Sequence, residues 1–405
     1  MDDARVTRVG FGAVLAVAEF RAMWAAELLS VCGDQLARVA LAVLVYQRTN
    51  SAALTGLTYA LTYVPSLLGG ILLAGAGDRW ARRDVMVVAD VARAALVGVI
   101  AIPGVPLWVL CVLVAVMTAL GGPFKAAQQA LLPTVLEGER YLVGMALRNV
   151  TIQGAQLAGF AGGGLLIAAL APSAALALDA VTFVLSAIFL VAGVRRRAAV
   201  AQAVRPAWLS TTSAGIRLIW RDPALRTLVA LNWLAGFYVV PEALAAPYAA
   251  GIGAGAALVG LLMAADPAGS VLGGVVFGKW VPERVQVRVL GWLGIAAGLP
   301  LIVFVFRPGL VLSVVLLAAS GLLATGYNIQ GTVSFMRRVP DEHRAQCAGV
   351  NSAGLITVQG IGAAAAGGLA DVLGPAHTIA VAGAAGAAVA VPIARAWRRV
   401  GLEEP

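Results

Sequence analysis

Apolar segments long enough to cross a lipid bilayer recur along the whole chain, and short polar stretches separate them. A membrane-spanning helix needs about 20 predominantly apolar residues, and these segments lack the alternating pattern of barrel strands. We therefore expect helices, because lipid offers no partner to an unpaired backbone group. The sequence predicts twelve spans, at residues 22–47, 51–76, 85–103, 106–124, 141–168, 172–194, 226–249, 254–279, 286–306, 309–330, 345–369 and 374–396.

Composition agrees with lipid as the solvent for most of the chain. Charged residues make up 12% of the 405 residues, about half of the ~25% that is typical of soluble domains. The net charge is +9, but the arginines form short clusters between apolar runs and no continuous face, which argues against nucleic-acid binding. The bias toward Ala, Gly, Val and Arg is typical of a GC-rich bacterial genome.

The distribution of basic residues orients the spans. With the N-terminus inside, almost all arginines and lysines lie in or beside cytoplasmic segments, and only Arg48 and Arg307 fall in outside loops. An excess of Lys and Arg in short cytoplasmic loops is the general rule for membrane proteins. We therefore expect a multi-pass protein of the bacterial inner membrane, with both termini in the cytoplasm.

The longest polar segment divides the spans six and six. Within it, Gly215–Asp222 could form a short amphipathic helix on the cytoplasmic membrane surface. A shift of about 205 residues aligns polar and glycine positions of the two halves, such as Arg79 with Arg284. A nearly constant offset indicates a duplicated six-helix unit. We predict one bundle over 1–194, a linker over 195–225 and a second bundle over 226–405.

The polar loop between the second and third spans carries the motif Asp78-Arg79-x-x-Arg82-Arg83. It resembles the loop between helices two and three of the major facilitator superfamily, although Ala81 stands where that family has a glycine. Together with the twelve spans and the half-chain repeat, the resemblance covers essentially the whole chain. It implies an all-α membrane fold of twelve transmembrane helices in two pseudo-symmetric six-helix bundles.

Within that superfamily the chain is most similar to drug/proton antiporters of the enterobactin-exporter-like branch. The Phe20-Arg21 pair, the Gly33-Asp34 pair and the segment Val339–Arg344 suggest this branch. The resemblance implies a monomer without a cofactor that works by alternating access. It would couple proton entry to the efflux of an amphipathic small molecule, such as a drug, an antibiotic or a siderophore-like metabolite.

Two other readings stay open at this point. The first is an importer or a sodium-coupled carrier on the same fold. The second is a membrane-embedded enzyme or a receptor. An enzyme needs a catalytic constellation at one membrane depth, and the sequence shows none. A receptor would typically carry a sizeable extramembrane domain, whereas the longest polar segment here has about thirty residues.

Ionisable residues inside spans are costly in lipid, so they are the first candidates for function. Asp34 lies near the middle of the first span, and Arg38 follows one turn later on the same face. A carboxylate beside an arginine in a low dielectric can change its protonation with solvent access, as a proton-driven carrier requires. A structural ion pair is the alternative. The proton-coupling candidates are Asp34, Arg38, Glu27 and Asp266. We expect Glu27 to be exposed to water near the interface, and Asp266 to face either the cavity or a partner such as Arg38.

The loop motif has its own implied role. An acid at a cytoplasmic helix end can accept hydrogen bonds from the exposed amides of another helix and can pair with arginine. In the family this loop is a conformational latch, and the resemblance carries that role to Asp78, Arg79 and Arg83. We add Asp90 and Arg93 as a structural pair beside it, because they lie within about two turns of the cytoplasmic end, where arginine snorkels easily.

Further polar and aromatic residues are expected around a central cavity. Asn149, Gln153 and Gln156 follow each other at i, i+4 and i+7, and so form a polar stripe on one helix face. The glycines of segment 159–164 resemble a motif of drug exporters, or simply allow close helix packing. Of the two histidines, His343 lies outside the spans and His377 lies at the very start of the last one, so we expect no metal site within the membrane. The cavity candidates are Tyr59, Tyr63, Asn149, Gln153, Gln156, Asn232 and Tyr238.

Overall fold

The computed structural model describes residues 10–72, 80–197 and 208–400. Over these ranges the chain is almost wholly helical and contains no strand. Ten helical segments in the same ranges are long and apolar enough to cross a membrane. The prediction of an all-α membrane protein is therefore confirmed.

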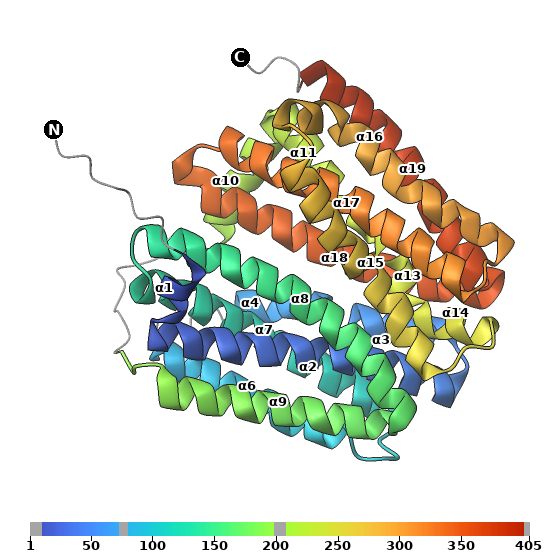
Figure 1. Ribbon diagram of the computed structural model, residues 1–405, viewed down its shortest axis with the longest axis horizontal. Helices are drawn as coiled ribbons and strands as arrows, with labels where there is room; N and C mark the ends of the chain where they lie inside the picture. The colour runs from blue at the N-terminus through green and yellow to red at the C-terminus, as the bar shows by residue number, and fades with distance from the viewer. Residues whose placement is uncertain (1–9, 73–79, 198–207, 401–405) are drawn as a thin grey trace.

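The first group of helices, blue to green in Figure 1, packs together along one side of the molecule. The long helix α2 is at its centre and contacts α3, α8 and α9. The members of this group are α1 (Phe11–Leu15), α2 (Ala18–Thr49), α3 (Ala52–Ala60), α4 (Val64–Leu72), α6 (Arg82–Ile100), α7 (Leu107–Val135), α8 (Glu139–Ala169) and α9 (Pro172–Gly193).

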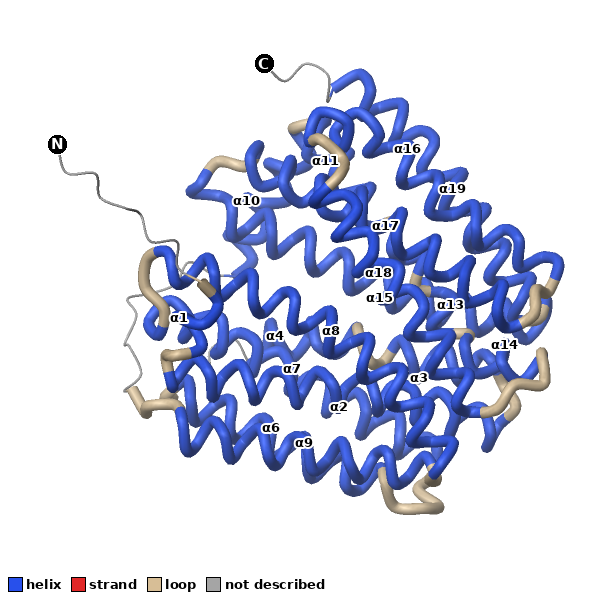
Figure 2. The backbone as a smooth tube through the Cα atoms, in the orientation of Figure 1, coloured by secondary structure: helices blue, strands red, loops and turns tan. Residues whose placement is uncertain are grey.

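The second group, yellow-green to red, lies beside the first. Over the described residues, five of its helices have 20 residues or more, and short loops join them to their neighbours, as Figure 2 shows. Its members are α10 (Trp208–Arg221), α11 (Pro223–Trp233), α12 (Ala235–Tyr238), α13 (Val240–Ala243), α14 (Ala245–Gly251), α15 (Ala256–Lys279), α16 (Glu283–Ile302), η1 (Val303–Phe306), α17 (Leu310–Arg338), η2 (Asp341–His343), α18 (Arg344–Leu373) and α19 (Pro375–Val400).

Two expected spans are not single helices. The sequence predicts one helix over 51–76 and one over 226–249, but the structure breaks both. A turn separates α3 from α4 just before Pro65, and the segment α11–α14 is interrupted around Pro241. Proline has no N–H for the helical hydrogen-bond ladder, and irregular backbone at membrane depth is tolerated where it lines a cavity.

The number of spans depends on how two segments are counted. The pair α3–α4 is split into two pieces of nine residues, and α6 carries charged residues along its 19-residue length. Neither is among the ten segments that qualify by length and composition. Counting both as spans gives twelve, and that number stays a prediction.

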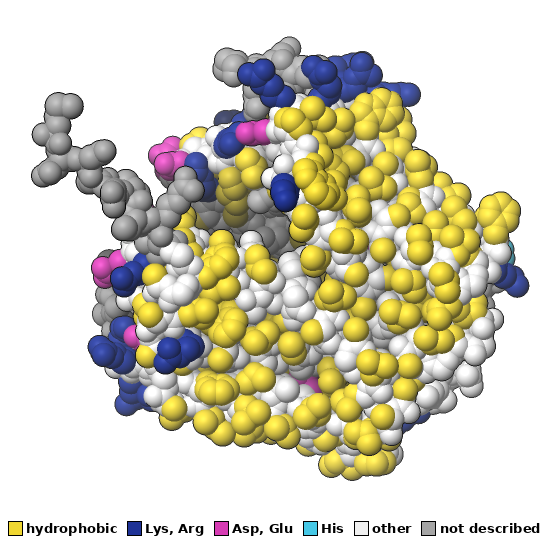
Figure 3. All heavy atoms as spheres, viewed as in Figure 1, with side chains coloured by type: hydrophobic (Ala, Val, Ile, Leu, Met, Phe, Trp, Pro, Cys, Tyr) yellow, Lys and Arg dark blue, Asp and Glu magenta, His cyan; other side chains and the backbone are white. Residues whose placement is uncertain are grey.

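The two ends of the helices differ in charge. One end, which we call the basic end, carries most of the arginines that surround the helix termini, and Figure 3 shows them gathered there. They include Arg82, Arg83, Arg140, Arg196, Arg337, Arg344 and Arg398. The opposite end has Arg48 and Arg307.

The two groups of helices touch closely only toward the opposite end, as far as the described residues go. There the Asp371 carboxylate on α18 accepts hydrogen bonds from the Ala52 amide at 2.7 Å and from the Ser51 hydroxyl at 3.0 Å. Glycines allow the backbones of α8 and α15 to meet, since a Cβ on Gly260 would lie 2.5 Å from the Gly164 Cα. At the basic end the groups diverge, and the surface is hollowed between them (Figures 1 and 3).

Candidate functional site

Two neighbouring chambers, which share part of their lining, lie where the two groups of helices face each other. The α2 chamber has a volume of about 290 Å³ and includes Asp34 in its lining. The α15 chamber has a volume of about 370 Å³ and includes Glu242 and Asp266. Four residues from α2, α8, α18 and the α3–α4 turn line both chambers: Arg38, Tyr63, Gln156 and Gln359. We call the two together the central cavity.

Arg38 stands between the two chambers. Its guanidinium lies 4.8 Å from the centroid of the Tyr63 ring and 6.0 Å from that of Tyr59, and it donates to the Gln35 side-chain oxygen at 3.3 Å. Cations are attracted to aromatic faces, more strongly where water is excluded. The expected pairing of Arg38 with Asp34 is not observed, because the aromatic rings and Gln35 hold the guanidinium.

Asp34 pairs instead with an arginine from another helix. Arg93 on α6 donates to the Asp34 carboxylate at 2.6 Å and to the Ser30 hydroxyl at 3.2 Å. The Asp34 side chain is 29% exposed and that of Arg93 only 6%. Asp34 therefore lies between the α2 chamber on one side and the interior of the first group of helices on the other. Its ion pair with Arg93 joins α2 to α6.

Asp90 and Arg93 lie in the interior of the first group, which corrects the expectation that they snorkel to the cytoplasmic interface. Asp90 is 0% exposed and Arg93 5%. The Ser186 hydroxyl on α9 donates to Asp90 at 2.5 Å, and the Arg93 guanidinium lies 4.0 Å from the centroid of the Phe183 ring. The pair joins three helices at mid-depth because α9 supplies partners that draw Arg93 inward.

Glu27 is also largely buried, which corrects the expectation that it is exposed to water at the interface, although it lines the α2 chamber. Arg148 on α8 donates to both carboxylate oxygens, at 2.6 and 2.5 Å, and also to the Gln128 side-chain oxygen at 3.0 Å. Two parallel N–H···O bonds are the strongest form of this ion pair. Arg148 and Gln128 are not among the candidates expected from the sequence, although an arginine two turns into an apolar span is a usable signal.

The α15 chamber contains two further acids. The Tyr59 hydroxyl donates to the Glu242 carboxylate at 2.5 Å, across the boundary between the two groups. Asp266 follows Ala265 in the middle of α15 and lines the same chamber as Arg38 without a hydrogen bond between them among the described contacts. Asp266 thus faces the cavity, one of the two positions that the sequence left open.

The structure brings some of the cavity candidates together and separates others. Tyr63, Gln153, Gln156 and Tyr238 line the central cavity. Three do not: Tyr59 is buried behind it against Glu242, Asn149 is exposed nearer the basic end, and Asn232 bonds to Asn351. The polar stripe on α8 reaches the cavity only over its last two members, because the chambers lie at mid-depth.

Only the second half of the loop motif, Arg82-Arg83, lies within the described residues. Asp78 and Arg79 lie outside the described residues. Arg83 pairs with the neighbouring Asp84 at 3.1 Å, and Asp84 also accepts from Arg196 at 2.7 Å. The start of α6 is therefore tied to the segment that follows α9.

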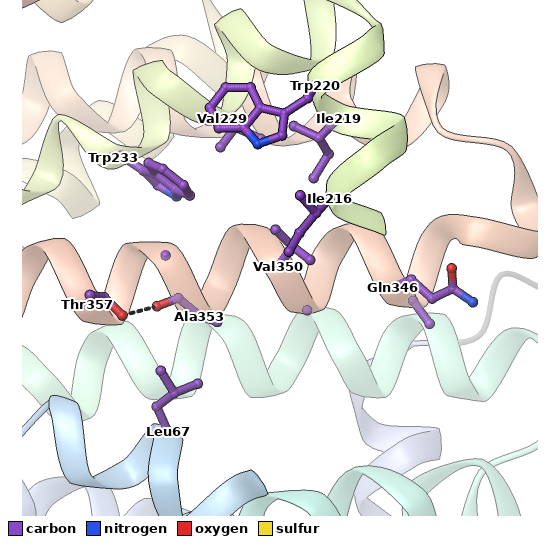
Figure 4. Close-up of a pocket in the computed structure, with 13 residues that line it drawn as sticks. Leu67, Ile216, Ile219, Trp220, Val229, Trp233, Gln346, Val350, Ala353 and Thr357 are labelled. Carbon is purple, nitrogen blue, oxygen red and sulfur yellow. Dashed lines mark hydrogen bonds between the residues drawn. The ribbon is translucent and has the colours of Figure 1, made fainter. Parts of the chain in front are cut away.

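A third, apolar space opens beside the central cavity toward the basic end. It has a volume of about 630 Å³. Figure 4 shows Ile216 and Ile219 from α10, Trp233 from α11 and Val350 from α18 among the residues that line it, with Leu67 contributed by α4. We call it the apolar vestibule. The amphipathic helix expected at Gly215–Asp222 is present here as α10.

Comparison with protein families gives a match to the Major Facilitator Superfamily over residues 23–245, more than half of the chain. The chain belongs to the major facilitator superfamily. Among curated proteins, the multidrug efflux pump Tap of Mycobacterium tuberculosis (strain ATCC 25618 / H37Rv) is 30% identical over 323 residues, which is 74% of each chain. The Tap protein of Mycobacterium bovis (strain BCG / Pasteur 1173P2) matches with the same identity and coverage.

Solved structures of major facilitator proteins share the fold. A mutant form of the nucleoside transporter NupG has a TM-score of 0.73 and 13% identity, and the match covers 94% of this chain and 99% of that one. A mutant form of the peptide transporter POT has a TM-score of 0.72 and 14% identity, with 95% of both chains covered. This chain is accordingly a multi-pass membrane transporter, while the enterobactin-exporter-like branch stays a prediction.

Proposed function

We propose that the protein exports an amphipathic small molecule from the bacterial cytoplasm in exchange for protons. The observation that carries the proposal concerns Asp34, an acid at mid-depth. It faces the central cavity and forms an ion pair with Arg93, whose side chain is buried inside the first group of helices. Such a carboxylate can release its arginine when it binds a proton, and so couple protonation to helix packing. The 30% identity to a multidrug efflux pump supports export as the direction.

The shape of the binding space favours an amphipathic substrate. The apolar vestibule offers Trp233 and aliphatic side chains, whereas the central cavity offers Arg38, Gln156 and the carboxylates of Glu242 and Asp266. A ligand site of this kind combines a large apolar surface with a few polar groups that fix orientation. A molecule with an apolar body and a polar or charged group fits both spaces at once.

The placement of contacts supports a mechanism of alternating access. The groups of helices meet near Asp371 and Gly164 and diverge at the basic end. If the basic end is cytoplasmic, as the arginine excess favours, this conformation is open to the cytoplasm. Segments 1–194 and 226–405 would then rock as two bodies, with 195–225 as the linker, in a monomer.

Reconstituted vesicles test the proposal. With an imposed pH gradient, we expect a fluorescent lipophilic cation such as ethidium to move against the direction of the protons, and no movement when the gradient is collapsed. Asp34→Asn should fold but lose the coupled movement. Transport that depends on sodium, or accumulation of substrate inside whole cells, would instead select the sodium-coupled carrier or the importer. Undiminished coupled transport by Asp34→Asn would exclude Asp34 as the proton carrier.

A further inference from the structure

Two carboxylates pair with one guanidinium inside the first group of helices, and a third acid is buried near them. Arg93 lies 2.6 Å from Asp34 and 3.7 Å from Asp90. The third acid is Asp179 on α9, and the charged groups near enough to act on it electrostatically are Asp34, Arg93 and Asp90. Asp34 is the member that lines the α2 chamber. We call these four residues the Arg93 cluster.

Three members of the cluster have a buried polar atom that lacks a hydrogen-bond partner among the described residues: Asp90 Oδ1, Arg93 Nε and Asp179 Oδ2. Asp90 still forms an ion pair with Arg93, whereas the described contacts include no ion pair of Asp179. Asp179 is 0% exposed. One carboxyl oxygen, Oδ1, accepts from the Thr182 hydroxyl at 3.2 Å, but Oδ2 is buried and has no hydrogen-bond partner among the described residues. Polar atoms buried in a protein are almost always hydrogen-bonded, so each exception needs a physical account.

The position of Asp179 against α2 is specific. A Cβ on Gly33 would lie 2.2 Å from the Asp179 Oδ1 and from the Thr182 hydroxyl oxygen. Only a glycine at that position lets the carboxyl reach the backbone of α2, one residue before Asp34. The chain therefore places a fully enclosed acid beside the acid that opens to the cavity.

The charges of the cluster do not balance. With all three carboxyls ionised, two negative charges stay in excess over Arg93 in the interior of a membrane protein. Among the described contacts no other cation forms an ion pair with these acids. Arg148 is engaged by Glu27, and Arg38 and Lys125 line the α2 chamber, which Asp34 lines but Asp90 and Asp179 do not. Burial of an uncompensated charge costs several kcal/mol or more, and a proton is the smallest group that removes it.

We propose that Asp179 holds a proton on Oδ2 and exchanges it with the central cavity through Asp34. This inference rests on the proposed proton-coupled transport and adds a second proton-binding residue to it. A proton from cavity water bonds to a carboxylate oxygen of Asp34, which releases Arg93 toward Asp90. When that O–H bond breaks, a new O–H bond forms at Asp179 Oδ2, and Asp34 recovers Arg93.

Infrared difference spectroscopy tests the proton directly and needs no substrate. The full chain in lipid nanodiscs near neutral pH should show a carboxylic-acid C=O band that Asp179→Asn removes. The exposed Asp341, whose side chain is 88% exposed, gives a matched control, since Asp341→Asn should leave the band unchanged. An identical band in wild type and Asp179→Asn would overturn the proposal, as would a band that disappears when sodium replaces choline in the buffer.

A second variant covers the case in which Asp179→Asn does not fold. Thr182→Val keeps the carboxyl but removes its hydroxyl partner, so the C=O band should shift without being lost. An unshifted band would again overturn the proposal.

Transport stoichiometry tests the exchange with Asp34. In vesicles, the reversal potential of Asp179→Asn should correspond to one proton fewer per substrate than that of wild type. An unchanged stoichiometry would overturn the exchange. If wild type moves no substrate at all, the proposed function fails, but the infrared result still decides whether Asp179 carries a proton.

Discussion

Arg148 on α8 and Glu27 on α2 form a two-bond ion pair that is largely buried at the edge of the α2 chamber. Their side chains are 9% and 10% exposed, and the bonds measure 2.6 and 2.5 Å. The pair joins two helices of the first group, two turns of α2 before Asp34. Its geometry is that of a structural tie, and it gives the first prediction.

Removal of one partner should destabilise the protein more than removal of both. Glu27→Met or Arg148→Met leaves a buried charge unpaired, which costs about 3–5 kcal/mol. The double variant replaces the pair by apolar side chains of similar volume and should recover most of the loss. Thermal unfolding in detergent measures the three variants, and vesicle transport should persist in the double one. A double variant that loses coupled transport but keeps its stability would give Glu27 a coupling role instead.

Gly164 and Gly260 allow the two groups of helices to meet. A Cβ on Gly164 would lie 2.6 Å from the Ala257 carbonyl oxygen and 2.7 Å from the Gly260 Cα. Gly164→Ala should therefore destabilise the closed contact between α8 and α15 by about 1–3 kcal/mol, which changes the population ratio of the two conformations roughly 5- to 150-fold.

Distance measurements between spin labels report that change. Trp108 and Val311 are exposed at the opposite end, one on each group, and their separation should increase in Gly164→Ala. Gly162→Ala is the matched control on the same helix, because a Cβ there meets nothing within 4 Å. An equal shift in both variants would contradict the steric account.

Asp371 forms a polar contact between the two groups of helices, in addition to the glycine contact between α8 and α15. Its carboxylate accepts from the Ala52 amide at the first turn of α3, where the helix dipole favours a negative charge. Loss of a capping side chain costs typically ~1 kcal/mol, so Asp371→Ala should favour opening at this end about fivefold. The same label pair measures the effect, and Asp371→Glu should restore part of it. A distance distribution unchanged by Asp371→Ala would show that the contact does not control the conformation.

Asp222 gives a pH-dependent prediction at the basic end. It caps α11 through the amide of Ala224 at 2.8 Å and accepts from Arg338 at 2.9 Å. Burial raises the pKa of the Asp222 carboxyl, but the hydrogen bonds from Arg338 and from the backbone amides outweigh it and hold that pKa below its ordinary value. The stabilisation is therefore fully present above the unfolded-state pKa, ~3.9, and is lost as the pH falls through the folded-state value.

Asp222→Asn separates the charge from the cap, because asparagine also caps helices. At pH 7 it should lower the free energy of unfolding by up to about 1 kcal/mol, the range of partly exposed ion pairs, whereas Asp222→Ala should lose the cap as well. Unfolding measured from pH 7 to pH 3 should show wild type and Asp222→Asn converging. A constant difference at all pH values would contradict the charge contribution.

The sequence alone determined the class of fold. Length and spacing of the apolar segments decide between water and lipid, and lipid leaves only helices for a chain of this pattern. The motif at Asp78-Arg79 and the half-chain repeat then pointed to the superfamily that the comparisons identify. These features are local, so a single chain without coordinates displays them.

Tertiary structure alone decided which polar groups meet. Asp34 and Arg38 are one turn apart, yet Asp34 binds Arg93, 59 residues away, and Arg38 lies against Tyr63. Helix periodicity fixes the face on which a side chain lies, but not the neighbour that this face meets. The neighbour depends on how α2, α6, α8 and α9 pack, and small residues such as Gly33 set how closely they approach. Buried charges such as Asp34 and Glu27 take their ion-pair partners from other helices, because their own helix cannot surround them.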